Sequence, residues 1–162
     1  MKLQPKAGSH LPVLMKAVAE TDGPILELGC GMYSTNPLHW ACWVPKRRLV
    51  TYEHNPKFYN FAKAYETEFH EVHCIDDWDA IDISEPWSVA FVDHAPAHRR
   101  GIEMGLLTHA EYVVVHDSEA KRDDTYQLRK NHHLYKYHFE YEGAAPHTSV
   151  FSNTHDVRDF FG

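Results

Sequence analysis

Apolar residues follow two spacings along the chain, one typical of helices and one typical of strands. Near the N-terminus they recur at helical spacing from Leu11 to Ala19, and Asp22-Gly23-Pro24 ends this helix. The short segment Ile25-Leu26-Glu27-Leu28 then predicts a buried strand. Further strands are predicted over 48–53, 71–75, 87–92 and 112–115, and helices over 36–45, 55–68, 97–107 and 119–130.

Two cap signals place the starts of the helices in this series. Asn36-Pro37 and Asn55-Pro56 each combine a capping residue with proline at the first helical position. Ser118 is a third candidate cap, for the helix over 119–130. After residue 130 the rhythm changes to two strand-like segments, 134–141 and 148–152, whose separation suits an antiparallel hairpin.

Strands that alternate with helices predict a parallel sheet. We therefore expect an α/β fold with a doubly wound, mostly parallel sheet, helices on both faces and a C-terminal antiparallel strand pair. No linker or repeat divides the chain, so residues 1–162 are expected to form one domain. Its parts are an N-terminal helix over 10–22, a core over 24–152 and a short tail over 153–162.

Composition narrows the functional classes. The formal net charge of −7 argues against a protein that holds nucleic acid mainly through phosphate contacts. The basic runs Lys46-Arg47-Arg48 and Arg99-Arg100 are interpreted as solvated surface charges. No apolar run reaches the roughly 20 residues of a membrane span, and no secretory signal is visible. Three cysteines without metal-like spacing indicate free thiols and a cytoplasmic location.

Polar residues stand where the predicted parallel strands end. They are Glu27 to Gly31, Glu53, Asp76 and Asp77, Asp93 and His94, and His116 and Asp117. The carboxyl ends of parallel strands meet at one edge of a sheet, and open α/β sheets bind ligands there, near the point where the strand order reverses. The sequence therefore predicts a ligand site at this edge.

The loop after the first strand, Gly29-Cys30-Gly31, suits a tight turn that lets a ligand approach the backbone. Glu53 follows Gly31 by 22 residues and is placed to accept hydrogen bonds from ribose hydroxyls. Glu27 would repel a pyrophosphate but not a cationic ligand, and Ser34 stands where a dinucleotide fingerprint has its third glycine. These features favour a cationic adenosyl ligand over NAD.

Ile25 to Gly31 closely resembles the first motif, acidic-x-Gly-x-Gly, of the class I S-adenosylmethionine-dependent methyltransferases. Thr51 to Pro56, Ile75 to Trp78, Phe91 to His94 and Val113 to Asp117 resemble the later motifs in order, so that the likeness spans about residues 10–152. The resemblance implies S-adenosylmethionine as the cofactor. The cofactor-binding residues that it implies are Glu27, Gly29, Cys30, Gly31, Glu53, His54, Asp76, Asp77, Trp78 and Asp93.

The chain departs from the family pattern in two ways. Met32-Tyr33 interrupts the run of small residues in the loop, and the Asn-Pro-Pro-aromatic motif of base amino-group methylation is absent. The chain is also close to the minimal core, which leaves little room for a substrate domain. We therefore expect a small-molecule acceptor bound by loops, the N-terminal helix or a second subunit of a homo-oligomer.

Methyl transfer requires alignment and, for a hydroxyl acceptor, a base. The candidates are Asp93 and His94, because the fourth strand's end faces the methyl group in the resembling family, and then His116. A divalent cation held by Asp93, His116, Asp117 and Glu119 is a second possibility, but no ligand spacing is diagnostic and no metal is predicted.

Three alternatives stay open at this point. The protein could bind S-adenosylmethionine for other chemistry, either aminopropyl transfer or cofactor cleavage. It could be a non-catalytic partner subunit, which its small size favours. It could also be an NAD-dependent oxidoreductase, against which Glu27 and the missing third glycine count.

Overall fold

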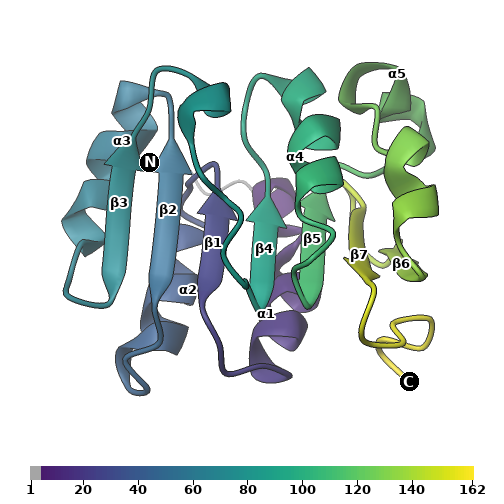
Figure 1. Ribbon diagram of the computed structural model, residues 1–162, viewed down its shortest axis with the longest axis horizontal. Coiled ribbons are helices and arrows are strands. Elements are labelled where there is room, and N and C mark those ends of the chain that lie inside the picture. Colours follow the sequence, from purple (N-terminus) through teal and green to yellow (C-terminus); the bar gives the residue numbers. More distant parts are fainter. Residues whose placement is uncertain (1–4) are drawn as a thin grey trace.

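The computed structural model describes residues 5–162 and contains a seven-stranded sheet with the order β3-β2-β1-β4-β5-β7-β6 (Figure 1). β1 to β5 are parallel, whereas β7 runs antiparallel to both β5 and β6. The strands are β1 Ile25–Leu28, β2 Leu49–Glu53, β3 His70–Cys74, β4 Val89–Val92, β5 Tyr112–His116, β6 Tyr137–Tyr141 and β7 Thr148–Ser152. The predicted fold class, with its C-terminal antiparallel pair, is confirmed.

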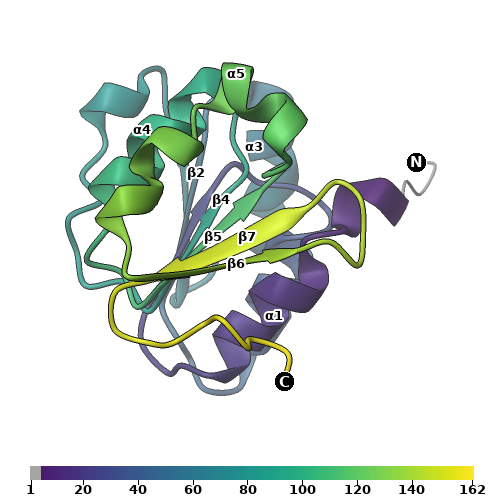
Figure 2. The same ribbon diagram turned by 90° about the vertical axis from the view of Figure 1, so that its right-hand side faces the viewer.

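Helices cover both faces of this sheet (Figure 2). α1 Leu11–Ala19, α2 Thr35–Trp43 and α3 Pro56–Ala62 lie on one face, and α4 Arg100–Leu106 and α5 Asp123–Tyr126 lie on the other. Each face has its own apolar core, one centred on Leu14 and Leu38 and the other on Met104 and Trp87. The 3₁₀ turns are Pro5–Gly8, Lys63–Tyr65, Trp78–Ala80, Ala97–Arg99, Ala120–Arg122 and Arg129–Leu134. No helix among the described residues is long and apolar enough to cross a bilayer.

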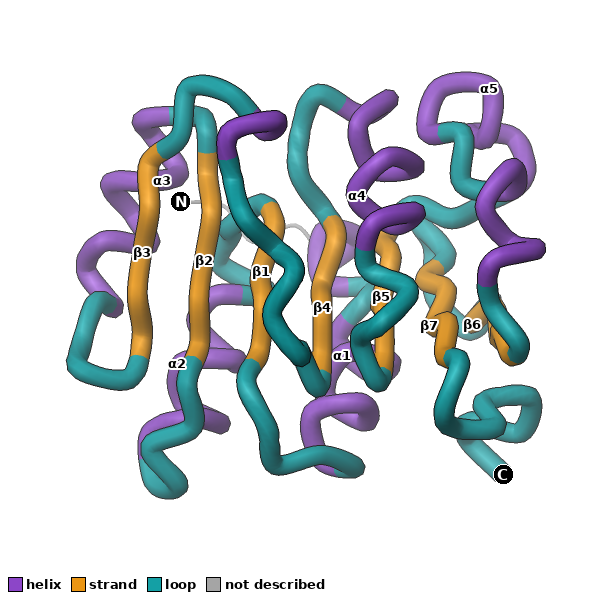
Figure 3. The backbone as a smooth tube through the Cα atoms, in the orientation of Figure 1, coloured by secondary structure: helices purple, strands orange, loops and turns teal. Residues whose placement is uncertain are grey.

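The connection from β3 to β4 crosses the α4 face of the sheet with a single 3₁₀ turn in place of a helix (Figure 3). Trp78, Ile83 and Trp87 from this connection are buried in the core, which covers the sheet as a helix would. The two indole N–H groups donate to the carbonyl oxygens of Ala95 and Ile83, so burial leaves neither donor unpaired.

The cap of α3 is confirmed, but that of α2 was predicted two residues too late. Asn55 Oδ1 accepts a hydrogen bond from Lys57 N at 3.0 Å, and Pro56 is the first residue of α3. α2 instead begins at Thr35, and the Asn36 side chain donates to the Tyr65 hydroxyl. α3 also ends earlier than predicted, at Ala62, and continues as a 3₁₀ turn.

The helix predicted over 119–130 is wrong. The chain forms two short turns around α5, and Gln127 adopts a left-handed conformation with φ 54°. α4 packs tightly against this point, since a Cβ on Gly101 would lie 2.7 Å from the carbonyl oxygens of Tyr126 and Gln127. Asn131 also donates to the Gly101 carbonyl oxygen. These tertiary contacts override the local helical pattern.

The strand order reverses between β1 and β4, and Gly29 lies where the chain leaves β1. Its φ of +87° favours glycine, and a Cβ there would lie 2.5 Å from the Cα of His94. The loops that follow β1 and β4 are therefore in backbone contact. Gly31 differs, because a Cβ on this residue would have Ser34 Oγ as its nearest neighbour, at 4.0 Å.

We expect Gly29→Ala to lower the free energy of unfolding by more than about 2 kcal/mol, because it adds a backbone clash to an unfavourable φ. Gly31→Ala is the matched control and should change that free energy by less than about 0.5 kcal/mol. Denaturant unfolding of both variants measures the difference. Equal losses would contradict the close approach of the two loops.

Candidate functional site

A cavity of about 610 Å³ opens where the strand order reverses, at the carboxyl ends of β1, β2 and β4. The loop after β1 contributes Cys30 and Gly31 to its wall, β2 contributes Glu53 and His54, and the β4 end contributes Asp93 and His94. His10 and Arg100 also belong to the wall, together with further polar residues: Tyr33, Ser34, Asn55 and Lys57. A larger hollow of about 750 Å³ lies near the amino ends of β1 and β2, but none of the predicted site residues lines it.

Two carboxylates hold the loop that lines this cavity. The Cys30 amide donates to Glu53 Oε2 at 3.0 Å. The Gly31 amide donates to Thr35 Oγ1 at 3.0 Å, and the Thr35 hydroxyl in turn donates to Glu27. Both amides are therefore already used within the protein. A pyrophosphate needs such amides as free donors, so this loop is unsuited to a dinucleotide.

Glu27 is fully buried beneath the loop and does not line the cavity. Its carboxylate accepts hydrogen bonds from Thr35 and from Thr51, the latter at 2.7 Å. Burial raises the pKa of Glu27 to about 7; the hydroxyl donors oppose that rise, and the charge of Glu53 adds to it. Glu27 was expected to face the ligand. In the structure its carboxylate faces the Thr35 and Thr51 hydroxyls and lies outside the cavity wall.

The hydrogen bonds to Glu27 continue away from the cavity. Thr51 gives its proton to Glu27, so His70 Nε2, 2.9 Å away, donates to Thr51. His70 Nδ1 then accepts from His39 Nδ1 at 3.1 Å. Burial and the neighbouring His39 lower the pKa of His70 to about 4, which keeps the ring neutral as this chain of donors requires. The network fixes β1, β2 and β3 against α2.

Glu53 is 4 % exposed and has its carboxylate at the cavity wall. Besides the Cys30 amide, it accepts a hydrogen bond from Asn55 N at 2.7 Å, and His54 Nδ1 lies 3.2 Å from it. The predicted residues after β3 lie elsewhere. Asp76 and Asp77 are exposed, Trp78 is buried, and none of the three lines the cavity.

Arg100 joins the ends of β4 and β5. Its guanidinium lies 2.9 Å from Asp93 Oδ1 and 3.0 Å from Asp117 Oδ2, and it donates to the carbonyl oxygens of His94 and His116. The interpretation of Arg100 as a solvated charge is therefore wrong. Arg47 is also buried, and its guanidinium donates to the carbonyl oxygens of Val18 and Thr21.

Asp93 is held between Arg100 and His116. Burial alone would raise the pKa of Asp93, but the contact with His116 and the charge of Arg100 hold it below the usual value. Its other oxygen, Oδ2, lies 3.2 Å from His116 Nδ1. Asp93 thus stays ionised at the cavity wall, while His116 supports it from behind and does not line the cavity.

His94 belongs to the cavity wall, but its ring is fully buried and already has partners within the protein. Its Nε2 lies 3.1 Å from Glu103 Oε2, and the ring packs on Trp78 with 4.1 Å between centroids. Burial lowers the pKa of His94 more than Glu103 raises it. The ring is therefore placed to orient the β4 end, and Asp93 is the better placed of the two to meet an acceptor.

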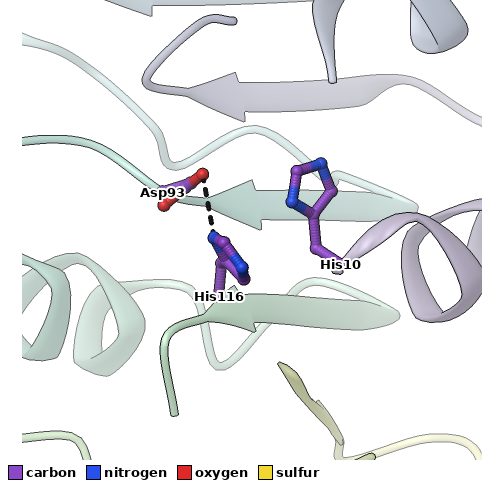
Figure 4. Close-up of side chains that lie close together, drawn as sticks. All are labelled: His10, Asp93 and His116. Carbon is purple, nitrogen blue, oxygen red and sulfur yellow. Dashed lines mark hydrogen bonds and ion pairs between the residues drawn. The ribbon is translucent and has the colours of Figure 1, made fainter. Parts of the chain in front are cut away.

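Sequence reasoning missed His10. Its side chain is buried and lies beside His116 (Figure 4), with 4.8 Å between the two ring centroids. The centroid of the Phe91 ring is 4.7 Å away. Ser9 beside it contacts His116 Nε2 at 2.9 Å. No spacing relates residues 9 and 10 to residue 116, so only the tertiary fold reveals this contact.

The four-residue metal set considered from the sequence does not assemble. Asp117 pairs with Arg100, and Glu119 lies 3.3 Å from Arg122. Ligand atoms of His10, Asp93 and His116 instead lie within 4.8 Å of one another. His10 therefore takes the place that Asp117 and Glu119 had in the prediction.

The fold is that of the class I methyltransferases, as comparison with solved structures shows. The O-methyltransferase TomG from Streptomyces achromogenes, solved with SAM, matches at 19% identity and a TM-score of 0.62, with 95% of this chain and 82% of that chain covered. An O-methyltransferase from Bacillus cereus in complex with SAH matches at 16% identity and a TM-score of 0.61, over 93% and 82% of the two chains. Human methyltransferase-like protein 13, also with SAH, matches at 15% identity and 0.64, over 93% and 84%. No family model matches the sequence, and no curated protein does.

The buried Glu27 predicts how stability depends on pH. Its pKa is about 7 in the folded protein and about 4.5 when solvated, so the folded state binds this proton more tightly and loses stability as pH rises through that range. Between pH 5 and pH 8 the free energy of unfolding of the wild type should fall by about 2–3 kcal/mol relative to Glu27→Gln.

Urea unfolding at several pH values measures this difference. Glu142→Gln removes an exposed carboxylate and serves as the matched control, whose difference from the wild type should stay flat over the same range. Parallel pH curves for the wild type and Glu27→Gln would show that Glu27 does not titrate in the folded protein as described.

Proposed function

We propose that the protein is an S-adenosylmethionine-dependent methyltransferase of the cytoplasm that acts on a small-molecule acceptor. The observation that carries the proposal is the pairing of Glu53 with the loop at Cys30 and Gly31. A carboxylate with spare acceptor capacity lies at the cavity wall, beside the Cys30 and Gly31 amides, which are already paired within the protein and are not free to bind a phosphate. This combination favours a nucleoside with a cationic substituent over a dinucleotide.

The wall fits such a group. Gly31 has an ordinary φ and open space around its Cα, so the protein itself does not require glycine there, whereas a ligand lying against the backbone would. Glu53 would accept hydrogen bonds from two ribose hydroxyls. The other residues implied by the methyltransferase resemblance have separate roles: Glu27 and Gly29 shape the loop from beneath, and Trp78 supports His94 from behind.

When bound, S-adenosylmethionine supplies an electrophilic methyl group on a sulfonium. Transfer of that methyl group to a lone pair of the acceptor would leave the electron pair of the broken carbon–sulfur bond on sulfur. Asp93 orients the acceptor by accepting a hydrogen bond from its hydroxyl or amine. His116 and Arg100 hold the Asp93 carboxylate in place, and His94 fixes the β4 end next to it.

The proposal predicts micromolar-range binding of S-adenosylhomocysteine in calorimetric titration, with no comparable binding of NAD. Glu53→Ala should weaken this binding by at least about tenfold, because it removes the acceptor of the ribose hydroxyls and one anchor of the loop. Glu142→Gln changes an exposed acid outside the cavity that has no implied part in cofactor binding, and it should leave the affinity unchanged.

Absence of S-adenosylhomocysteine binding would reject the proposed cofactor. If it binds, incubation with S-adenosylmethionine labelled on the methyl group and a panel of phenols, catechols, carboxylic acids and amines tests the reaction. Methyl transfer releases S-adenosylhomocysteine. Aminopropyl transfer would release methylthioadenosine instead, and a non-catalytic partner subunit would release neither.

A further inference from the structure

Three buried or half-buried side chains from distant parts of the chain meet beside the cavity. His10 precedes α1, Asp93 follows β4 and His116 ends β5, and one ligand atom of each lies within 4.8 Å of the others (Figure 4). His10 and Asp93 also line the cavity. The cluster is therefore closed by protein on one side and open to the cavity on the other.

Hydrogen bonds on the outer side of both rings set which nitrogen carries a proton. The carbonyl oxygen of Tyr33 lies 3.1 Å from His10 Nε2 and can only accept, so this nitrogen is the donor. Ser9 donates its own proton to the carbonyl oxygen of Pro146 at 2.7 Å. Ser9 Oγ must then accept from His116 Nε2 at 2.9 Å.

The Nδ1 atom of each ring is left on the inner side of the cluster. His10 Nδ1 is buried, has no hydrogen-bond partner within the described residues 5–162, and faces Asp93 and His116 (Figure 4). His116 Nδ1 lies 3.2 Å from Asp93 Oδ2. Metal-binding histidines show this arrangement, in which one nitrogen donates to an outer acceptor and the other is directed at the ion.

We propose that His10, Asp93 and His116 form a binding site for a divalent transition-metal ion. Two imidazoles and one carboxylate suit ions of the Zn²⁺, Fe²⁺ and Co²⁺ type, whereas Mg²⁺ and Ca²⁺ prefer sites made of oxygen ligands. Three protein ligands leave a coordination position free. Because His10 and Asp93 line the cavity, that position faces the space where a second molecule would bind.

Arg100 determines where the ion would lie. Its guanidinium already occupies the space between Asp93 Oδ1 and Asp117 Oδ2, so a cation cannot bridge those two carboxylates. Oδ2 of Asp93 is on the side of His116, away from this contact. The negative charge of Asp117 offsets that of Arg100, which leaves the Asp93 carboxylate able to balance a cation.

The binding itself does not depend on the proposed function, but a catalytic use of the ion would rest on it. An acceptor oxygen in the free coordination position would lose its proton more readily. The ion would thereby help to remove the acceptor's proton. Asp93 alone does this poorly, because a carboxylate held ionised by Arg100 and His116 is a weak base.

The test is titration of the metal-free protein with Co²⁺ and Zn²⁺, followed by cobalt absorption and calorimetry. We expect one equivalent to bind, with no displacement by excess Mg²⁺. His10→Ala and Asp93→Asn should each weaken Co²⁺ binding by at least about tenfold. The control is His147→Ala, because His147 belongs to a second group, with Glu140 and Glu142, whose spacing could also hold an ion.

Circular dichroism establishes that each variant is folded. If a variant does not fold, a measurement on the wild type still tests the proposal. Zn²⁺ should shift the ring ¹⁵N signals of two histidines, His10 and His116. Absence of one-equivalent binding, binding lost in His147→Ala but kept in His10→Ala, or a shift of a single histidine would overturn the proposal. A parallel titration with S-adenosylhomocysteine tests the proposed function separately, so that failure of the metal site can be told apart from failure of the proposed function.

Discussion

The cavity depends on two acidic side chains that hold one loop from two directions. Glu53, at the end of β2, takes the Cys30 amide directly, and Glu27, in β1, takes the Gly31 amide through Thr35. A strand-to-helix loop otherwise leaves its amides to solvent or to a bound anion. Here the protein supplies the negative charge itself, which gives the loop a fixed shape and makes it a poor anion site.

A second set of contacts fixes the backbone on the other side of the cavity. Arg100 fixes the ends of β4 and β5, and Ser9 connects His116 to Pro146 in the loop before β7. The N-terminal segment, the parallel strands and the antiparallel pair therefore meet at one point. This convergence gives the cavity a polar wall built from distant parts of the chain.

The sequence was sufficient for the architecture, because the central strands β1, β4 and β5 are short, mostly apolar runs with polar residues at or just after their ends. The sequence was a less reliable guide where tertiary contacts determine the local conformation or the burial of a side chain. The helix over 119–130 was wrong because Gly101 packs against the carbonyl oxygens of Tyr126 and Gln127. Arg100 has the sequence signature of a surface charge and is nevertheless buried against two carboxylates. His10 carried no signal at all, since its neighbours Phe91 and His116 are distant along the chain.

The internally bonded loop also has a consequence for the kinetics of binding. Because the Cys30 and Gly31 amides already have partners within the protein, a ligand does not need to order this part of the loop, and little conformational entropy is lost when it binds. Association should then proceed as a single fast phase whose rate rises in proportion to ligand concentration. Discrimination between ligands would then arise mainly from differences in their dissociation rates.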